Sequence, residues 1–243
     1  FLILEQDHLP NVMMERSGYV IPEIPYRTVF TEIQKRIPEI IYMIHLETYR
    51  WICFCDPKKE IEAVGDAIVE YLAEETESTF SMIFFSQKMN VMECRKKYEK
   101  IEFLSQRRYF EGTSAVMYAD LYEMPKPSKD VNLDEFVEAF EKNDKDTAVR
   151  VLDRTFRMIL YRYDFQAFEE TVRQVLLEME SKQKQLYEKF QLYDEEVCQL
   201  MSVRRIVRWL KEKVTEILEI RKKEQHFTSG AMERAVRFIY QEY

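Results

Sequence analysis

The first half of the chain carries short runs of β-branched and aromatic residues. They lie at residues 1–6, 39–46, 49–55, 79–85 and 115–121, and each run predicts a β-strand. A tight turn separates the second run from the third, so these two predict a β-hairpin. Both faces of the hairpin are apolar, and we therefore expect it in the centre of a sheet that is covered on at least one side.

Between these runs, apolar residues recur at helical spacing. Residues 26–36 predict a helix that ends before Pro38, whereas residues 7–25 predict a turn region. Asp56 predicts the N-cap of a second helix, with Pro57 in its first turn.

A third helix is predicted before the last strand. Asn90 and Glu93 have the spacing of a capping box, and Gly112 predicts the end of the helix. Strands joined by single helices around one hairpin indicate an α+β fold. We predict a ferredoxin-like, degenerate nucleotide-cyclase-like sheet domain over residues 1–124.

Beyond a linker at 125–130 the pattern becomes purely helical, and we predict an all-α bundle and connector over residues 125–228. Its last helix is capped by Ser202 and is followed by a polar connector at 221–230. Residues 229–243 predict the start of a helix in a further domain. The long helix has one apolar stripe, formed by Val203, Ile206, Val207, Leu210, Val214, Ile217 and Leu218. This stripe must pack within its own bundle or against a second copy, and the second possibility predicts a homodimer.

Composition narrows the function classes. The 4 glycines form neither a G-x-G-x-x-G motif nor a P-loop, which excludes glycine-rich phosphate loops. The formal net charge of −8 argues against nucleic-acid binding by this region alone. Four cysteines without a C-x-x-C pair predict buried free thiols in a reducing cytoplasm. No apolar run is long enough to predict a membrane contact.

The order of elements resembles that of class III nucleotide cyclases and GGDEF-type diguanylate cyclases. In those families an Asp after the first strand and a carboxylate in the hairpin hold two Mg²⁺ ions against a triphosphate. Asp7 stands at the first position. The turn at 47–51 reads Glu-Thr-Tyr-Arg-Trp, so it lacks the glycines and has Arg50 where a carboxylate is needed. We predict Asp7 to be an ordinary strand-end residue, and we assign no catalytic, metal-binding or cofactor-binding residue and expect no cofactor.

Other features keep alternatives open. We expect His45 to be a residue of the core or of the sheet whose hydrogen bonds are satisfied, rather than a catalytic base. The basic run at 204–213 is interleaved with glutamates and predicts a solvated helix face. The strands are rich in aromatic residues, which predict either part of the hydrophobic core or the lining of a pocket for a small-molecule effector. These residues are Tyr42, Trp51, Phe54, Phe80, Phe84 and Phe85. An effector-binding sensor is therefore the first alternative function, and an active nucleotide cyclase is the disfavoured one.

Two stretches resemble a known family. Residues 98–112, YEKIEFLSQRRYFEG, resemble the Y-x-x-A-x-x-A-L-x-x-R-x-F-x-G segment of YesN-type response regulators, and YADL at 118–121 resembles the Y-x-D-L that follows it. Residues 235–243, AVRFIYQEY, resemble the A-x-x-Y-I-x-x-H-Y with which the AraC-type DNA-binding domain begins. In the first stretch, four positions match the family segment: Tyr98, Arg108, Phe110 and Gly112. The same stretch departs from it at Ile101 and Leu104, which stand at alanine positions. In the second stretch, Phe238 replaces the first Tyr and Glu242 replaces the His.

This resemblance implies the central regulatory region of a bacterial AraC-family transcriptional regulator in a two-component system. It implies promoter binding through helix-turn-helix units beyond Tyr243, and an input module before Phe1 that is either a receiver or a membrane sensor. We therefore expect a cytoplasmic, non-catalytic region for signal relay and dimerisation, with no DNA-binding residue of its own.

Overall fold

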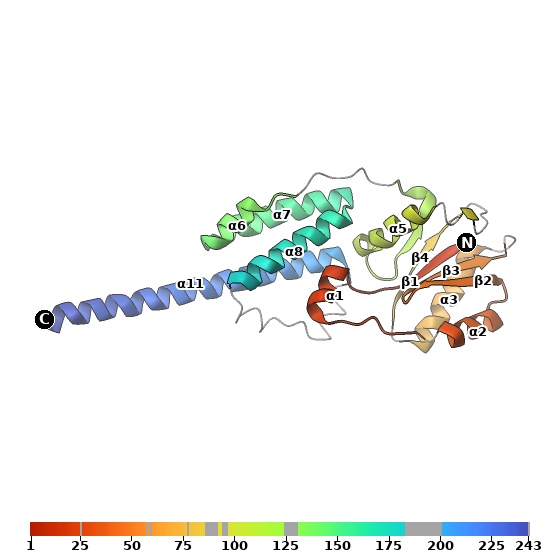
Figure 1. The fold of residues 1–243 in the computed structure, drawn as a ribbon, viewed down its shortest axis with the longest axis horizontal. Coiled ribbons are helices and arrows are strands. Elements are labelled where there is room, and N and C mark those ends of the chain that lie inside the picture. The colour runs from red at the N-terminus through yellow and green to blue at the C-terminus, as the bar shows by residue number, and fades with distance from the viewer. Residues whose placement is uncertain are drawn as a thin grey trace. The chain divides into compact units, whose positions relative to one another are not determined.

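The computed structural model describes residues 1–24, 26–56, 58, 60–76, 78–85, 92–93, 97–123, 131–182 and 201–242. The fold is α+β, with one sheet and a set of longer helices (Figure 1). Contacts between Cα atoms divide the chain into two compact units. The first consists of Phe1–Pro127 with Leu192–Arg205, and the second of Ser128–Gln191 with Ile206–Tyr243.

A five-stranded mixed sheet forms the first unit, with the order β2-β3-β1-β4-β5. The pairs β2–β3, β3–β1 and β1–β4 are antiparallel, and β5 is parallel to β4. All five predicted strands are present, although residues 119–121 of the last run form a 3₁₀ turn instead. The strands are β1 (Leu2–Gln6), β2 (Ile40–Glu47), β3 (Arg50–Cys55), β4 (Phe80–Phe84) and β5 (Val116–Tyr118).

The prediction that the hairpin lies in the centre of the sheet is wrong. The central strand is β1, and β2 is an edge strand. Ile41 and Tyr42 of β2 are 62% and 56% exposed, so the apolar residues that suggested a central strand partly face solvent. Two register shifts interrupt the pairing of β2 with β3, and such bulges are common at sheet edges.

Among the described residues up to Glu123, four helices can be assigned bounds, and two predictions about them need correction. The predicted turn region contains α1 (Asn11–Ser17), a short helix that follows Pro10. Asp56 is not an N-cap: its Oδ1 atom accepts a hydrogen bond from the Lys58 amide at 2.9 Å, and α3 (Ile61–Glu75) begins five residues later. The other two helices are α2 (Tyr26–Arg36), as predicted, and α5 (Tyr98–Glu111). Asn90 of the predicted capping box lies outside the described residues, and Gly112 ends α5 with φ 106°.

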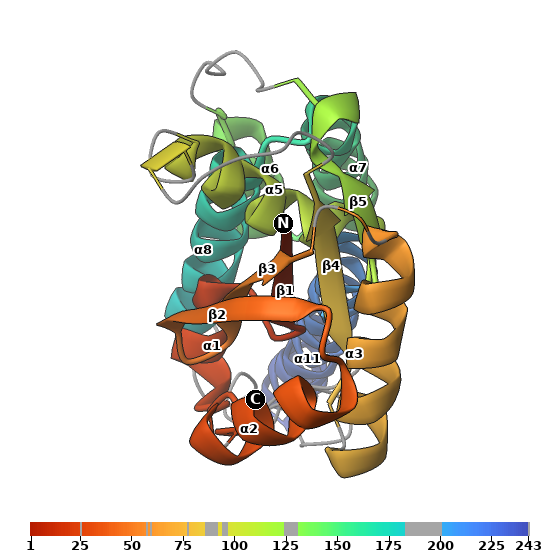
Figure 2. The same cartoon turned by 90° about the vertical axis from the view of Figure 1, so that its right-hand side faces the viewer.

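Helices cover both faces of the sheet. Ile33 of α2 and Ile68 of α3 pack against one face, together with Trp51 of β3. Ile101 and Leu104 of α5 pack against the opposite face. In Figure 1, α5 accordingly lies above the strands while α2 and α3 lie below them, and Figure 2 shows the same strands from the side.

On the face below α5, the strand register places side chains of one kind side by side. One row is aromatic, with ring centroids 4.4–6.5 Å apart: Tyr42, Phe54, Phe1 and Phe85. The next row is aliphatic: Ile44, Ile52, Ile3, Ile83 and Met117. The third row is polar: Glu47, Arg50, Glu5 and Ser81. Period-two alternation therefore buries a polar row under α5, beside two apolar ones.

The residues of the second unit that the structure describes are mainly helical, as predicted. Asp144 and Asp164 accept hydrogen bonds from the amides of Thr147 and Ala167 at 3.1 and 3.0 Å, which fixes the starts of two of them. The helices are α6 (Asp134–Glu141), α7 (Lys145–Arg162), α8 (Phe165–Lys182) and α11 (Val203–Glu242). No helix in the described part of the chain combines the length and apolar character needed to cross a bilayer.

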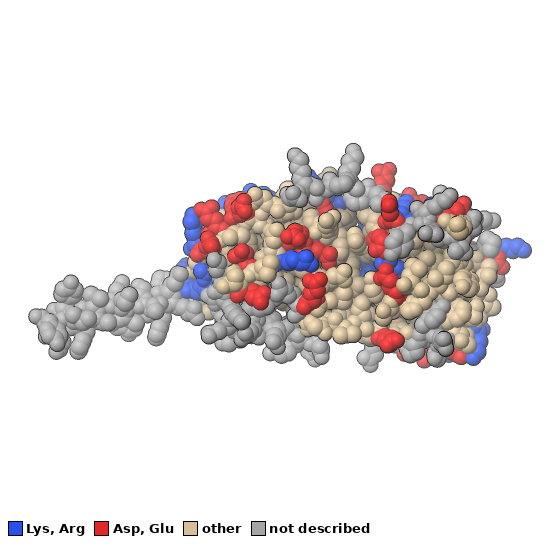
Figure 3. All heavy atoms as spheres, in the orientation of Figure 1, with Lys and Arg blue, Asp and Glu red and all other residues tan. Residues whose placement is uncertain are grey.

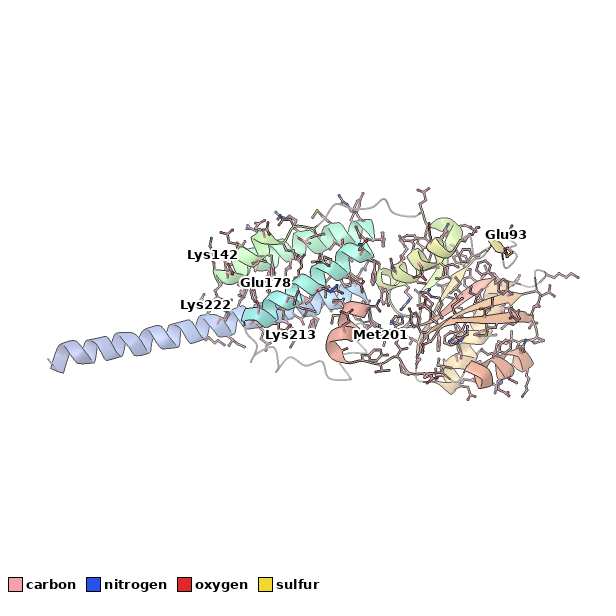
Figure 4. All side chains as sticks on the ribbon, in the orientation of Figure 1. Glu93, Lys142, Glu178, Met201, Lys213 and Lys222 are labelled. Carbon is pink, nitrogen blue, oxygen red and sulfur yellow. The ribbon has the colours of Figure 1, made fainter. Side chains whose placement is uncertain are left out.

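The long helix α11 differs from the prediction in two ways. Its apolar stripe, including Leu210, Val214 and Ile217, is buried within a single copy of the chain, so the stripe does not require a second copy. The predicted polar connector at 221–230 is absent, because the backbone stays helical through to Glu242. Arg221 donates hydrogen bonds to the carbonyls of Phe140 (2.8 Å) and Glu141 (3.5 Å) at the end of α6, where Figure 4 labels the neighbouring residues Lys142 and Lys222.

Candidate functional site

The polar row of the sheet joins α5 in a buried network of charged side chains. Glu5 of β1 is fully buried, and Arg50 of β3 is 3% exposed. Arg108 of α5 is 2% exposed, and Asp7 and His8, just after β1, are equally buried. Buried charges are costly unless they are paired and hydrogen-bonded. The pairing within this network therefore determines what the site can do.

Three carboxylates converge on Arg50. Its Nε atom donates to Glu5 Oε1 and its Nη1 atom donates to Glu102 Oε1 on α5. Nη1 also lies 3.5 Å from Glu47 Oε1 at the end of β2. Ser105 of α5 donates from Oγ to the same Glu5 oxygen at 2.7 Å. Arg50 therefore links the ends of three elements, β1, β2 and α5.

A second guanidinium group lies beside the first. Arg108 Nε is 3.2 Å from Glu5 Oε2, and Nη1 is 3.6 Å from Asp7 Oδ1. Its Nη2 atom donates to Tyr109 Oη at 2.9 Å, and its Cζ atom lies 4.1 Å from the centroid of the Tyr109 ring. The two arginines thus share Glu5 from opposite carboxylate oxygens.

Asp7 uses both carboxylate oxygens inside the protein. Oδ1 accepts from Ser81 Oγ at 2.5 Å, and Oδ2 accepts from the Ser114 amide at 2.8 Å. Ser81 Oγ in turn accepts from the Ala115 amide at 3.0 Å. Asp7 therefore holds the segment that leads into β5 against β4, which is a structural role at the end of a strand.

His8 is buried as a neutral imidazole. Its Nδ1 atom lies 2.8 Å from the Leu9 carbonyl and 3.2 Å from Tyr109 Oη, and the Tyr49 ring packs on it with centroids 4.2 Å apart. Desolvation is the main cause that lowers the pKa of His8 to about 3, and the nearby positive charge of Arg108 lowers it further. His8 therefore adds no positive charge to the network near neutral pH.

The arginines remain charged despite their burial. Burial alone lowers the pKa of Arg50, but Glu5 and Glu102 outweigh it and the pKa rises. The pKa of Arg108 is also raised, because Tyr109, Glu5 and Asp7 outweigh its desolvation. Burial, followed by the hydrogen bond and negative charge of Glu47, raises the pKa of Tyr49. The site therefore holds two permanent cations among four carboxylates.

These residues do not fit the two Mg²⁺ ions that the cyclase resemblance implies. The Asp7 oxygens are bonded to Ser81 and Ser114, and Arg50 lies in the turn where a metal-binding carboxylate is needed. A guanidinium group repels a metal cation at the same place. Among the described residues, no three His, Cys, Asp or Glu side chains are placed to hold a metal ion.

The other sequence candidates do not assemble into a site. His45 lies in the edge strand β2, as a sheet residue was predicted to do, and its exposed ring stacks on Trp51. Cys53 is buried and Cys55 is half-buried, and burial raises the pKa of both thiols, as expected for unreactive cysteines. Cys94 and Cys198 lie outside the described residues.

The aromatic residues proposed to line one effector pocket fall on opposite faces of the sheet. Trp51, Phe80 and Phe84 pack on the side of α2 and α3, whereas Phe54 and Phe85 pack on the side of α5. They form two cores rather than one pocket, so they no longer support an effector-binding sensor.

Two lysines of the basic run at 204–213, which was predicted to be a solvated helix face, form ion pairs. Lys211 lies 2.6 Å from Asp153, and Lys213 lies 3.5 Å from Glu216. On the face drawn in Figure 3, acidic and basic side chains are interspersed over these helices. These two lysines of α11 are therefore paired with carboxylates rather than grouped for phosphate binding.

The buried network itself was missed in the sequence, although a signal for it exists. Glu5, Arg50 and Ser81 are polar residues inside otherwise apolar strands, at positions that the register later aligns. No protein-family model matches the chain, and searches of curated proteins and of solved structures find no match either.

Proposed function

We propose that the chain is the non-catalytic regulatory region of a bacterial AraC-type response regulator, and that it relays an input to a DNA-binding domain. The sequence stretches at 98–112 and 235–243 support the family. The fold is compatible with a degenerate cyclase-like domain, because strands β2-β3-β1-β4 are all antiparallel and α2 and α3 share one face. Both features support the proposed split βαβ, or ferredoxin-like, unit.

The observation that carries the non-catalytic part is the pairing of Arg50 with Glu5 and Glu102. A triphosphate site needs metal-binding carboxylates with free oxygens at the end of β1 and in the hairpin. Here the hairpin contributes a cation, and the carboxylates at β1 are used by protein partners. The network instead joins the sheet to α5, which suits a rigid element of a relay.

The absence of turnover is directly testable. We expect the chain to form no cyclic mononucleotide or dinucleotide when it is incubated with GTP or ATP and Mg²⁺, because Arg50 occupies the metal-binding position. Product analysis by chromatography would measure this. An Asp7→Ala chain is the matched control: product that appears with the natural chain and disappears with Asp7→Ala would show a working metal site and contradict the proposal.

The relay also requires a second copy of the chain, and a surface for it is available. The edge strand β2 has no charged residue from Ile40 to Leu46, and Ile41, Tyr42 and Leu46 are exposed. An exposed, apolar edge strand is suited to binding another strand. Because each copy carries a net charge of −8, an uncharged edge is where two copies repel each other least. We therefore propose an antiparallel β2–β2 contact between two copies.

Light scattering coupled to gel filtration tests this contact. We expect a dimer for the natural chain and a monomer for Tyr42→Glu, because a buried unpaired carboxylate on each strand would oppose association. Tyr161→Glu is the matched control, since Tyr161 is 86% exposed on α7 and lies in the other unit. A natural chain that stays monomeric at high concentration, or a Tyr42→Glu chain that stays dimeric, contradicts the β2 contact.

A further inference from the structure

The aromatic row on the α5 face of the sheet continues outward to the edge strand β2. Phe85 and Phe1 stack with their ring centroids 4.4 Å apart and an interplanar angle of 15°. The Phe54 ring follows at 5.8 Å from Phe1, and the Tyr42 ring of β2 follows at 6.5 Å from Phe54. Phe85 is 2% exposed at the inner end of the row, whereas Tyr42 is 56% exposed at the outer end. The row therefore ends at the sheet edge in a ring that is open to solvent.

We propose that the Tyr42 ring packs against Tyr42 of a second copy, so that two copies form one aromatic row across a shared edge. This inference rests on the proposed β2–β2 contact and specifies its register. Directly opposite residues on antiparallel strands lie on the same face, with Cβ atoms about 4.5–5.5 Å apart. Rings held at that spacing would continue a row whose centroids are 4.4–6.5 Å apart, and aromatic pairs at such separations attract each other.

The charges at the two ends of β2 disfavour the neighbouring registers. Glu39 precedes the uncharged stretch 40–46, and Glu47 follows it. If Met43 lay opposite its own copy, Glu39 of each copy would lie opposite Glu47 of the other, and like charges directly opposite each other destabilise a sheet. If Ile44 lay opposite its own copy, each Glu47 would lie opposite Ile41, where apolar surface would displace water from the carboxylate.

The register centred on Tyr42 avoids both conflicts. It places Glu39 of one copy opposite His45 of the other, and an imidazole can donate a hydrogen bond to a carboxylate in either of its protonation states. Glu47 would extend past the first residue of β2 in the second copy, Ile40, so the pairing sets no second carboxylate against it. Aromatic packing and charge therefore favour the same alignment.

A charge-exchange experiment tests the register. Tyr42→Lys and Tyr42→Glu chains should each be monomeric alone, because each would place two like charges opposite each other. An equimolar mixture of the two should form a heterodimer, with a dissociation constant at least about 10-fold below that of either chain alone. Light scattering coupled to gel filtration over a concentration series measures both constants.

Two control mixtures report on the other registers. Tyr42→Lys with Leu46→Glu would associate if Ile44 lay opposite its copy, and Ile41→Glu with His45→Lys would associate if Met43 did. Both mixtures should gain less than about twofold over their separate chains. All four side chains are at least 36% exposed or lie in the exposed class on β2, so the substitutions leave the core unchanged.

Uncharged variants test the stacking itself. Tyr42→Phe keeps the ring and should bind within about twofold of the natural chain, whereas Tyr42→Thr removes the ring from a strand position that suits Thr. It should weaken the dimer by about 3- to 10-fold, the range measured for aromatic pairs.

The failures can be told apart. A natural chain that stays monomeric contradicts the proposed β2 contact, and the register falls with it. A natural dimer whose charge-exchange mixture stays monomeric overturns the register alone, as does a control mixture that associates equally well. Equal affinities for Tyr42→Phe and Tyr42→Thr would overturn the aromatic packing.

Discussion

Replacement of Arg108 by Met is expected to lower the free energy of unfolding of the sheet unit by about 3–5 kcal/mol, the usual cost of removing one partner from a buried ion pair. The substitution keeps much of the side-chain volume but leaves Glu5 Oε2 without its cation, 3.2 Å away in the natural chain. It also removes the positive charge beside Asp7 and the hydrogen bond to Tyr109. Urea unfolding followed by Trp51 fluorescence in a Trp209→Phe background measures the loss.

The adjacent residue supplies the control. Arg107 pairs with Glu111 at 3.1 Å and lies over the Tyr122 ring on the outer side of α5. The same substitution there, Arg107→Met, should cost less than about 1 kcal/mol, because partly exposed ion pairs contribute little. An equal loss in the free energy of unfolding for Arg108→Met and Arg107→Met would contradict the prediction. It would mean that the buried ion pairs of the network stabilise the sheet no more than a partly exposed ion pair does.

Acidification is expected to destabilise the sheet unit through His8. In the folded chain the pKa of His8 is lowered to about 3, mainly by desolvation and then by Arg108. In the unfolded chain it has its ordinary value of 6.5. Between these values the unfolded state binds one proton more than the folded state. The contribution of His8 to the free energy of unfolding is therefore fully present above pH 6.5. Between the two pKa values of His8 it falls as the pH decreases, by about 1.4 kcal/mol per pH unit.

His8→Gln should remove this contribution. The free energy of unfolding, measured in urea from about pH 4 to about pH 6, should fall less steeply with acid for His8→Gln than for the natural chain. Carboxylates titrate in both chains, so the difference between the two slopes isolates His8. His45→Gln is the control, because it removes an exposed imidazole from the same sheet. Parallel slopes for His8→Gln and the natural chain would contradict a buried neutral histidine.

The local patterns predicted most of the elements. Apolar runs predicted the five strands, and the 3.6-residue spacing predicted α2 and the helices of the second unit. The short helix α1 was missed because seven residues between prolines carry little periodicity. The edge position of β2 was missed because two apolar faces indicate burial, whereas here Ile41 and Tyr42 are exposed.

The charged network was less accessible to sequence reasoning than the strands. Arg50 was recognised only as a residue that does not suit a metal site, since the sequence does not say which carboxylates it meets. Glu102 and Arg108 lie on a helix of modest amphipathicity, and such charges usually face solvent. Only the register of β1 with β3, and the packing of α5 above them, brings Glu5, Arg50 and Arg108 together.

The uninterrupted helix α11 has a mechanical consequence. Beyond Arg221, which donates hydrogen bonds to two carbonyls at the end of α6, it continues for about 20 residues, or about 30 Å at 1.5 Å per residue. If the helix from Val203 to Glu242 moved as one rigid rod, a change of about 10° in its tilt near Arg221 would displace its far end by about 5 Å. A continuous helix of this length would therefore turn a small change of packing near Arg221 into a larger displacement at Glu242.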